Sequence, residues 1–142
     1  DDRSGNNGSL VLRLTRNGRG LAVIPGDAER GVLSRLAASG AQLSADVLVL
    51  PHHGSATGLS RRFLAAVSPR AAIASCGDTW PFPAPKLEAL LEKGGCRVYA
   101  TRRDGAVTVT FPARSGEPVV RTRRASGEED AQTPFAMEAG TR

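Results

Sequence analysis

His52 and His53 are the only histidines of the chain, and they lie next to each other directly after a short apolar run. Residues 47–50 are rich in β-branched side chains, which predicts a buried strand. Pro51 cannot donate a hydrogen bond to a sheet, so the strand ends there, and Gly54 then allows the backbone to turn sharply. Because α/β proteins place their active sites at the carboxyl ends of strands, the two imidazoles are the first candidates for chemistry.

A carboxylate occupies the equivalent place after the preceding strand. Residues 21–24 predict a strand that a Pro-Gly pair breaks, and Asp27 follows. We therefore expect Asp27 to meet His52 and His53 over one edge of the sheet and to bind a metal. Imidazole and carboxylate ligands together suit Zn²⁺ or Mn²⁺.

Each candidate residue also has a purely structural interpretation. Asp27 precedes a helix predicted over residues 28–39 and is a typical N-cap residue. The histidines fit an ordinary surface turn, and neighbouring side chains at a strand end point in different directions, so we expect only one to be a ligand. Ser55 and Thr57 suit hydrogen bonds to a phosphate group, or they satisfy the turn itself.

The rest of the chain alternates between strands and helices. We expect strands at residues 9–15, 21–24, 46–50, 71–76, 97–100 and 107–111, and helices at residues 28–39, after the N-cap Ser60 and from Pro85. This order predicts an α/β (α+β layered) domain over residues 1–111, in which helices flank a mixed sheet. Residues 112–142 lose the pattern and predict a flexible tail with one extra strand at residues 119–122.

The composition adds weaker indications. Residues 1–112 hold 14 Lys and Arg against 9 Asp and Glu, so this part carries the whole net charge of +5, which is compatible with a nucleic-acid partner. Five arginines are candidates for contacts to a nucleic-acid backbone or for a solvated face: Arg61, Arg62, Arg70, Arg102 and Arg103. Trp80 and Phe82, in a Pro-rich loop, either stack on bases or pin the loop to the core. Cys76 and Cys96 fit small buried thiols.

Two further features concern the ends of the chain and the membrane. No apolar run approaches the roughly 18–20 residues that a membrane span needs. The chain begins with Asp rather than Met, and we expect it to be a piece of a longer protein.

Four stretches carry a family resemblance: Asn6-Asn7-Gly8-Ser9-Leu10-Val11-Leu12-Arg13-Leu14, Pro25-Gly26-Asp27, Val49-Leu50-Pro51-His52-His53-Gly54-Ser55 and Arg102-Arg103-Asp104-Gly105-Ala106-Val107. Over roughly residues 6–111 the chain resembles the metallo-β-lactamase-like domain of ComEC-type competence proteins. These are bacterial membrane proteins that carry transforming DNA across the inner membrane. The His-His-Gly-Ser block after a strand is the most specific part of the resemblance.

The resemblance implies a fold and a set of roles. The family fold is a four-layer αββα sandwich of two similar halves, and this chain resembles the carboxyl half. Asp27 matches the aspartate that bridges two metals, and His53 matches the late histidine ligand. His52 would contact substrate or support the site, so Asp27, His52 and His53 form the implied catalytic set, with Ser55 and Thr57 at the substrate.

The function that the resemblance implies is metal-dependent hydrolysis of phosphodiester bonds during natural transformation. Zn²⁺ or Mn²⁺ would be the cofactor of the intact domain, and its partners would be DNA and the membrane channel domain of the same polypeptide. The expected location is the bacterial inner membrane, with this soluble domain at its surface. Catalytic zinc keeps three protein ligands, so we expect the isolated chain to bind metal weakly and to be inactive.

The sequence departs from the family pattern at one place that favours a second hypothesis. Members often carry a histidine in the loop before the last helix, where this chain has Trp80-Pro81-Phe82-Pro83. Phe82 has no group that binds a metal, which favours a non-catalytic DNA-binding or assembly domain of the uptake channel. A third hypothesis is a homodimer, because half a sandwich exposes a sheet face and an edge.

Overall fold

The computed structural model describes residues 5–58, 60–113, 117–124 and 129–132. The strands are β1 (Leu12–Arg16), β2 (Arg19–Ile24), β3 (Val47–Val49), β4 (Ala71–Ala74), β5 (Arg97–Ala100), β6 (Ala106–Thr110), β7 (Val119–Arg123) and β8 (Glu129–Gln132). The α-helices are α1 (Arg30–Ala38), α2 (Arg61–Val67), α3 (Pro85–Lys93) and α4 (Thr101–Asp104). The 3₁₀ turns are η1 (Gly5–Gly8), η2 (Pro51–Gly54) and η3 (Ala56–Gly58).

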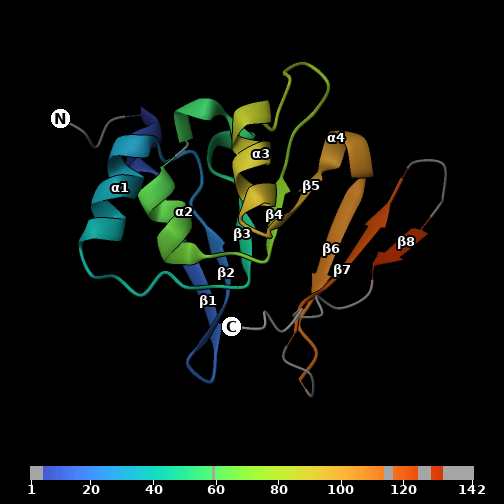
Figure 1. The fold of residues 1–142 in the computed structure, drawn as a ribbon, viewed down its shortest axis with the longest axis horizontal. Coiled ribbons are helices and arrows are strands. Elements are labelled where there is room, and N and C mark those ends of the chain that lie inside the picture. The colour runs from blue at the N-terminus through green and yellow to red at the C-terminus, as the bar shows by residue number, and fades with distance from the viewer. Residues whose placement is uncertain (1–4, 59, 114–116, 125–128, 133–142) are drawn as a thin grey trace.

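A five-stranded mixed sheet, in the order β1-β2-β3-β4-β5, positions the site (Figure 1). β1 and β2 form an antiparallel hairpin, whereas β2, β3, β4 and β5 run parallel to one another. The register pairs Ala22 with Val47 and Val47 with Ala71. The four parallel strands therefore all end at the same edge of the sheet, and the loops that follow them lie together.

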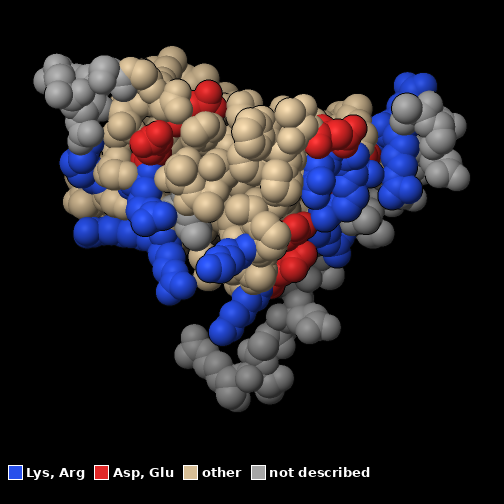
Figure 2. Space-filling view, turned by 90° about the horizontal axis from the view of Figure 1, so that it is seen from above, with Lys and Arg blue, Asp and Glu red and all other residues tan. Residues whose placement is uncertain are grey.

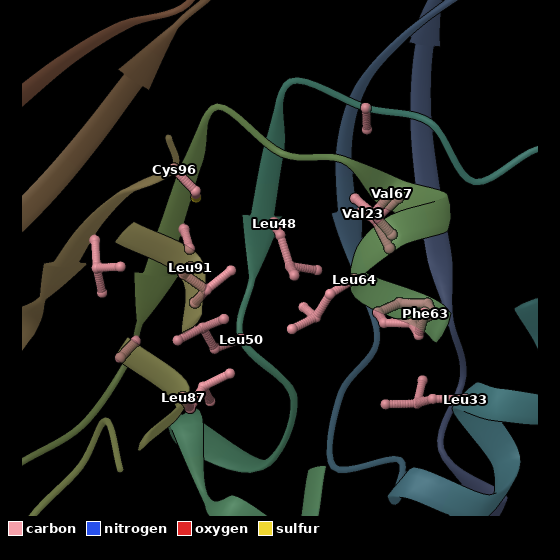
Figure 3. Close-up of a cluster of buried hydrophobic side chains, with 14 of the residues drawn as sticks. Val23, Leu33, Leu48, Leu50, Phe63, Leu64, Val67, Leu87, Leu91 and Cys96 are labelled. Atoms are coloured by element: carbon pink, nitrogen blue, oxygen red, sulfur yellow. The ribbon is translucent and has the colours of Figure 1, made fainter. Parts of the chain in front are cut away.

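Helices α1, α2 and α3 cover one face of this sheet (Figure 1). Their apolar side chains meet those of the strands in one cluster, in which Leu33, Leu48 and Phe63 have no exposed surface (Figure 3). Burying a side chain of this size stabilises the fold by about 1.5–3 kcal/mol. Leu87 of α3 and Val23 of β2 complete the same core.

The other face of the sheet packs on a second, antiparallel sheet formed by β6, β7 and β8. Ala71 and Tyr99 from the first sheet and Val120 from the second are buried in one cluster between them. The molecule thus has a helix layer and two sheet layers, which confirms the predicted layered α/β fold with a mixed sheet and flanking helices. The edge strand β1 leaves Leu12 and Leu14 about half exposed, at 46% and 48%.

Several predicted element boundaries are confirmed and others change. Ser60 is the N-cap of α2, where its Oγ accepts a hydrogen bond from the Phe63 backbone N–H at 3.2 Å, and Pro85 begins α3. The first helix begins at Arg30 rather than at residue 28, because the fully buried Ala28 donates its N–H to the Pro25 carbonyl and belongs to the preceding turn.

The turn expected around residues 104 and 105 is instead a short helix, α4. Its Asp104 carboxylate accepts a hydrogen bond from the Ala100 backbone N–H at 2.8 Å. Gly105, which ends it, has φ +74°, and a Cβ at this position would collide with the Arg123 carbonyl oxygen. This segment therefore joins the two sheets through a tight backbone contact.

The extra strand predicted at residues 119–122 is present as β7, and it pairs with β6 from Val119 opposite Thr110. β8 extends the same sheet. The Arg16 guanidinium donates hydrogen bonds to the Phe111 and Pro112 carbonyls at 2.8 and 3.1 Å, which ties this part to β1. Residues 114–116, 125–128 and 133–142 of the predicted tail lie outside the described residues, and the domain boundary at residue 111 stays a prediction. Of the helices in the described residues, none has both the length and the apolar composition to cross a bilayer.

Candidate active site

The turn that carries the two histidines has an unusual backbone. His52 and His53 both have left-handed conformations, with φ values of 48° and 57°, and Gly54 follows with φ +90°. A left-handed residue with a Cβ costs roughly 1–2 kcal/mol, and such conformations persist where surrounding contacts hold them, most often at functional sites. The turn therefore places both imidazoles at the cost of local strain.

Neighbouring loops hold this turn on both sides. The His52 backbone N–H donates to the Gly26 carbonyl at 3.1 Å, and the Gly54 carbonyl accepts from the Ala84 N–H at 2.9 Å. Gly54 also lies against Pro83, where a Cβ would approach the proline ring carbon to 2.9 Å. A glycine is thus required here by conformation and by space.

Asp27 and His53 meet as the sequence predicts. The His53 Nε2 atom lies 3.7 Å from Asp27 Oδ1, and the two side chains are 54% and 44% exposed. The other ring nitrogen, Nδ1, is 2.9 Å from the Ser75 carbonyl oxygen. A carbonyl only accepts hydrogen bonds, so Nδ1 carries the proton, and in the neutral ring Nε2 presents a lone pair toward the Asp27 carboxylate.

His52 points elsewhere, so the expectation that the two side chains diverge agrees with the structure. Its Nδ1 shares a 3.0 Å hydrogen bond with Thr57 Oγ1, which in turn is 3.0 Å from Ser55 Oγ. Ser55 Oγ also accepts the Thr57 backbone N–H at 3.3 Å. Both hydroxyls therefore satisfy the turn and orient His52, while their role toward a substrate stays a prediction.

The segment before β1 supports Asp27. Ser9 Oγ accepts the Asp27 backbone N–H at 3.2 Å, and Asn7 Oδ1 accepts the Glu29 N–H at 3.4 Å. Glu29 rather than Asp27 occupies the N-cap position of α1, so the N-cap interpretation of Asp27 is wrong. The sequence showed Asn7 and Ser9 only as part of the family resemblance, and no pattern connected them with Asp27.

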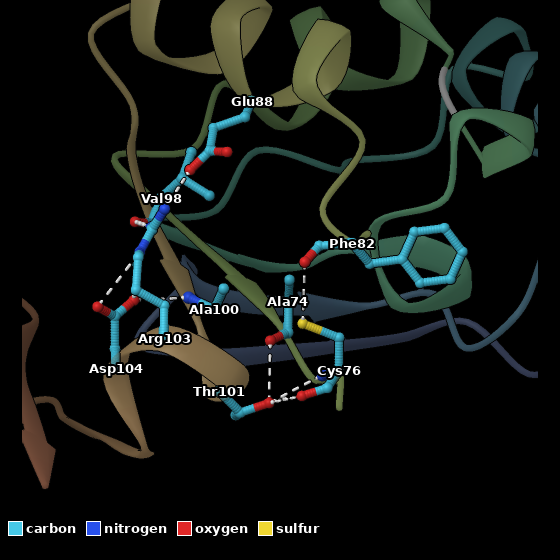
Figure 4. A network of polar contacts seen from close by, with 9 residues as sticks. All are labelled: Ala74, Cys76, Phe82, Glu88, Val98, Ala100, Thr101, Arg103 and Asp104. Atoms are coloured by element: carbon cyan, nitrogen blue, oxygen red, sulfur yellow. Dashed lines mark hydrogen bonds and ion pairs between the residues drawn. The ribbon is translucent and has the colours of Figure 1, made fainter. Parts of the chain in front are cut away.

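Thr101 is a functional residue that sequence reasoning missed. Its hydroxyl donates to the Cys76 carbonyl at 2.7 Å and accepts the Cys76 N–H at 2.8 Å, which clamps the loop after β4 (Figure 4). That loop also supplies the Ser75 carbonyl that orients His53. Asp27, His53, Ser75 and Thr101 thus come from the carboxyl ends of all four parallel strands, which only the sheet order reveals.

The donor set of the chain fits part of a metal site. Metal–nitrogen and metal–oxygen bonds are each about 2.0–2.2 Å long, so two ligands of one ion lie within about 4 Å of each other, as Asp27 Oδ1 and His53 Nε2 do. Among the described residues, however, no group of three or more His, Cys, Asp or Glu side chains is arranged to hold a metal. Two donors are one fewer than catalytic zinc sites take from a protein.

A pocket of about 380 Å³ lies beside His53. Ser75, Thr101, Trp80 and Phe82 are among the residues that line it. Phe82, at the place of the family histidine, is half-buried, whereas Trp80 is 66% exposed. The interpretation that Trp80 pins its loop to the core is therefore wrong for this residue.

The five arginines considered for nucleic-acid contacts divide into two groups. Arg103 donates to Glu88 at 2.8 Å, a hydrogen bond that raises the pKa of its guanidinium, and Arg70 pairs with Glu117 at 3.2 Å. The other three are exposed: Arg61, Arg62 and Arg102. Figure 2 looks down on the edge that carries the site and shows a mostly uncharged centre with basic side chains gathered around it.

Comparison with known proteins identifies the family. No family model matches the chain. The chain is 30% identical over 118 residues to ComE operon protein 3 of Bacillus subtilis, and 36% identical over 105 residues to competence protein ComA of Neisseria gonorrhoeae. These matches cover 82% and 72% of this chain. The chain is a ComEC-type competence domain. An uncharacterised Escherichia coli protein, YcaI, is 32% identical to it over 116 residues, or 78% of the chain.

The ComEC-type domain corresponds to a small part of these relatives, since each match spans 15% of the relative's length. Both named relatives match over most of this chain, so the similarity concerns the domain as a whole rather than one motif.

Proposed function

We propose that this domain takes part in DNA uptake during natural transformation and that it belongs to a metal-dependent nuclease that hydrolyses phosphodiester bonds. Two relatives are named as competence or ComE operon proteins, which supports the process. The single observation that supports the chemistry is the pair of His53 Nε2 and Asp27 Oδ1, 3.7 Å apart.

The arrangement of this pair favours a cation between the two atoms. Ser75 holds the proton on Nδ1 of His53, so the neutral ring turns a lone pair toward a carboxylate. At 3.7 Å the two atoms are also too far apart for a good hydrogen bond. Two electron-rich atoms that face each other at this distance are stabilised by a shared positive ion, and imidazole with carboxylate suits Zn²⁺ or Mn²⁺.

The residues of the chain divide the work around that ion. A bound divalent ion supplies hydroxide near neutral pH and neutralises charge on the phosphate. Asp27 contributes a negative charge, and its backbone is held by Ser9; His53 contributes Nε2, and its ring is oriented by Ser75. His52, held by Thr57, is in place to contact the substrate next to the ion.

The other ligands of such a site would come from the longer polypeptide in which relatives carry this domain. In this proposal the parent is a bacterial inner-membrane protein, the domain lies at the membrane surface, and DNA and the channel domain are its partners. The exposed Leu12 and Leu14 of the edge strand β1 offer an apolar surface for a neighbouring sheet or a second copy of this chain.

Nuclease assays on the full-length parent protein test the proposal. A labelled single-stranded oligonucleotide is incubated with the protein and Mn²⁺ or Zn²⁺, and cleavage is measured for the wild type, Asp27→Asn, His53→Gln and the exposed-loop control Asp78→Asn. We expect both site variants to lose cleavage by at least 100-fold, since metal ligands or their supports typically matter by about 10–100-fold or more, while the control keeps it. Equal cleavage by Asp27→Asn and the wild type would refute the proposed site.

A second candidate function is a non-catalytic DNA-binding or assembly module, and the position of Phe82 favours it. The phenyl ring lines the pocket beside His53 where the family pattern has a histidine. In that case full-length protein shows no metal-dependent cleavage, and Asp27→Asn leaves transformation efficiency unchanged. A loss of transformation in Asp27→Asn with normal protein levels would argue against the binding-module function.

A further inference from the structure

The exposed indole of Trp80 is the most unusual feature of the surface next to the candidate site. Trp80 is the only tryptophan of the chain, and 66% of its surface is exposed. A large aromatic side chain contributes most to stability when it is buried, so a tryptophan left in water next to a pocket indicates a binding surface.

The loop around Trp80 is held in place rather than hanging free. The Trp80 and Phe82 rings stack with centroids 6.5 Å apart and planes at 21°, and the Phe82 N–H donates to the Trp80 carbonyl at 2.7 Å. The Cys76 thiol donates to the Phe82 carbonyl at 3.4 Å, as Figure 4 shows. The indole therefore has a fixed support on one side and an open side toward solvent.

The indole borders the same pocket as the candidate active site. His53 and Trp80 both line the cavity of about 380 Å³, a volume within the range of small-ligand sites. Ser75 and Thr79 add hydroxyl groups to its wall, and no acidic residue is among those that line it. The pocket thus combines an aromatic platform, polar groups and an absence of negative charge in its lining, which suits a nucleotide.

We propose that this pocket binds one nucleobase of a single-stranded nucleic acid, stacked on Trp80 next to His53. Every base has a π-face, so stacking of this kind tolerates any sequence, and it would hold the strand beside the Asp27–His53 pair. The inference rests on the proposed function only in taking nucleic acid as the substrate. Stacking itself needs no metal, so the two proposals can fail separately.

Intrinsic fluorescence tests the proposal directly, because all tryptophan emission comes from Trp80. The 142-residue chain is titrated with a single-stranded thymidine oligonucleotide in buffer with EDTA, and with a strand of equal length and charge that lacks bases. We expect the oligonucleotide to quench the emission and the abasic strand to leave it almost unchanged. Equal quenching by both strands, or none by either at low salt, would overturn the proposal.

Variants separate stacking from general attraction to a polyanion. Binding of a fluorescein-labelled oligonucleotide is followed by anisotropy for the wild type, Trp80→Ala, Trp80→Phe and Leu10→Ala. We expect Trp80→Ala to weaken binding by about 5- to 100-fold, Trp80→Phe to retain part of the affinity, and Leu10→Ala, which removes another exposed apolar side chain, to bind normally. Unchanged binding by Trp80→Ala would refute base stacking.

Two further measurements distinguish other outcomes. Asp27→Asn is expected to keep the fluorescence quenching, because base stacking does not use the metal ligands; a variant that quenches normally but does not support cleavage separates the two proposals. Vesicles with anionic lipids are expected to leave the emission unchanged. A blue shift of Trp80 on vesicles, without quenching by the oligonucleotide, would show that the indole inserts into a membrane surface and would overturn the nucleobase site.

Discussion

Replacing Gly54 by alanine is expected to destabilise the domain strongly, for two reasons that the structure separates. The residue has φ +90°, and a Cβ would lie 2.9 Å from the Pro83 Cβ and 3.0 Å from its Cα. A left-handed residue with a Cβ costs about 1–2 kcal/mol, and an extra carbon in packed surroundings costs about 1–3 kcal/mol. The two effects sum to a loss of about 2–5 kcal/mol, against roughly 5–15 kcal/mol for the whole stability of a typical domain.

Gly40→Ala is the matched control for the backbone effect. Gly40 has φ +80°, and nothing lies within 4 Å of a Cβ built there, so its substitution is expected to cost only about 1–2 kcal/mol. Urea unfolding followed by far-ultraviolet circular dichroism gives both free energies of unfolding, provided that the two variants have the same slope as the wild type. If Gly54→Ala costs no more than Gly40→Ala, then Pro83 does not hold the histidine turn, and the account of how His53 is positioned is wrong.

Two other predictions concern charge. Burial raises the pKa of the Cys96 thiol from 9.0 to about 12; below pH 9 folded and unfolded chains both keep the proton, and above it only the unfolded chain loses it, so stability falls between pH 9 and 12 by about 1.4 kcal/mol per pH unit. Urea unfolding at pH 8 and pH 10.5 is expected to show this loss in the wild type beyond that of Cys96→Ala, and parallel behaviour of the two proteins would contradict it. Removal of the exposed Arg61 and Arg62 by substitution with Gln is expected to lower the salt dependence of single-strand binding by about 0.7 per lost phosphate contact. The equally exposed pair Arg121 and Arg123 on β7 serves as the control, and equal changes in both double variants would mean that Arg61 and Arg62 make no specific contact.

The local features of the site follow from short stretches of sequence. A β-branched run that ends at Pro51 predicts the strand β3, and Gly54 predicts the turn, because these residues restrict or free the backbone whatever the rest of the chain does. The N-cap at Ser60 is local in the same sense, since its hydroxyl meets an N–H three residues later. Such contacts span a few residues and leave a pattern that a sequence shows directly.

Some expectations failed where a tertiary contact outweighed a local preference. Asp27 is a favoured N-cap residue, yet Ala28 is buried and its N–H bonds to Pro25, so the helix begins later. Aromatic rings in a Pro-rich loop usually pack inward, yet Trp80 stacks on Phe82 and keeps its outer side in water. Composition cannot distinguish these outcomes, because they depend on which neighbours the folded chain brings near.

By itself, the sequence determined which residue types follow the strands: a carboxylate after one and two imidazoles after the next. Only the tertiary structure decided which of them meet. The parallel register of β2 and β3 brings Asp27 to His53, the loop after β4 supplies the carbonyl that orients the ring, and Thr101 after β5 clamps that loop. These partners lie more than 20 residues apart in the chain. The physical reason is that backbone pairing between strands sets their distances, and that pairing depends on burial of both sheet faces rather than on any local run of residues.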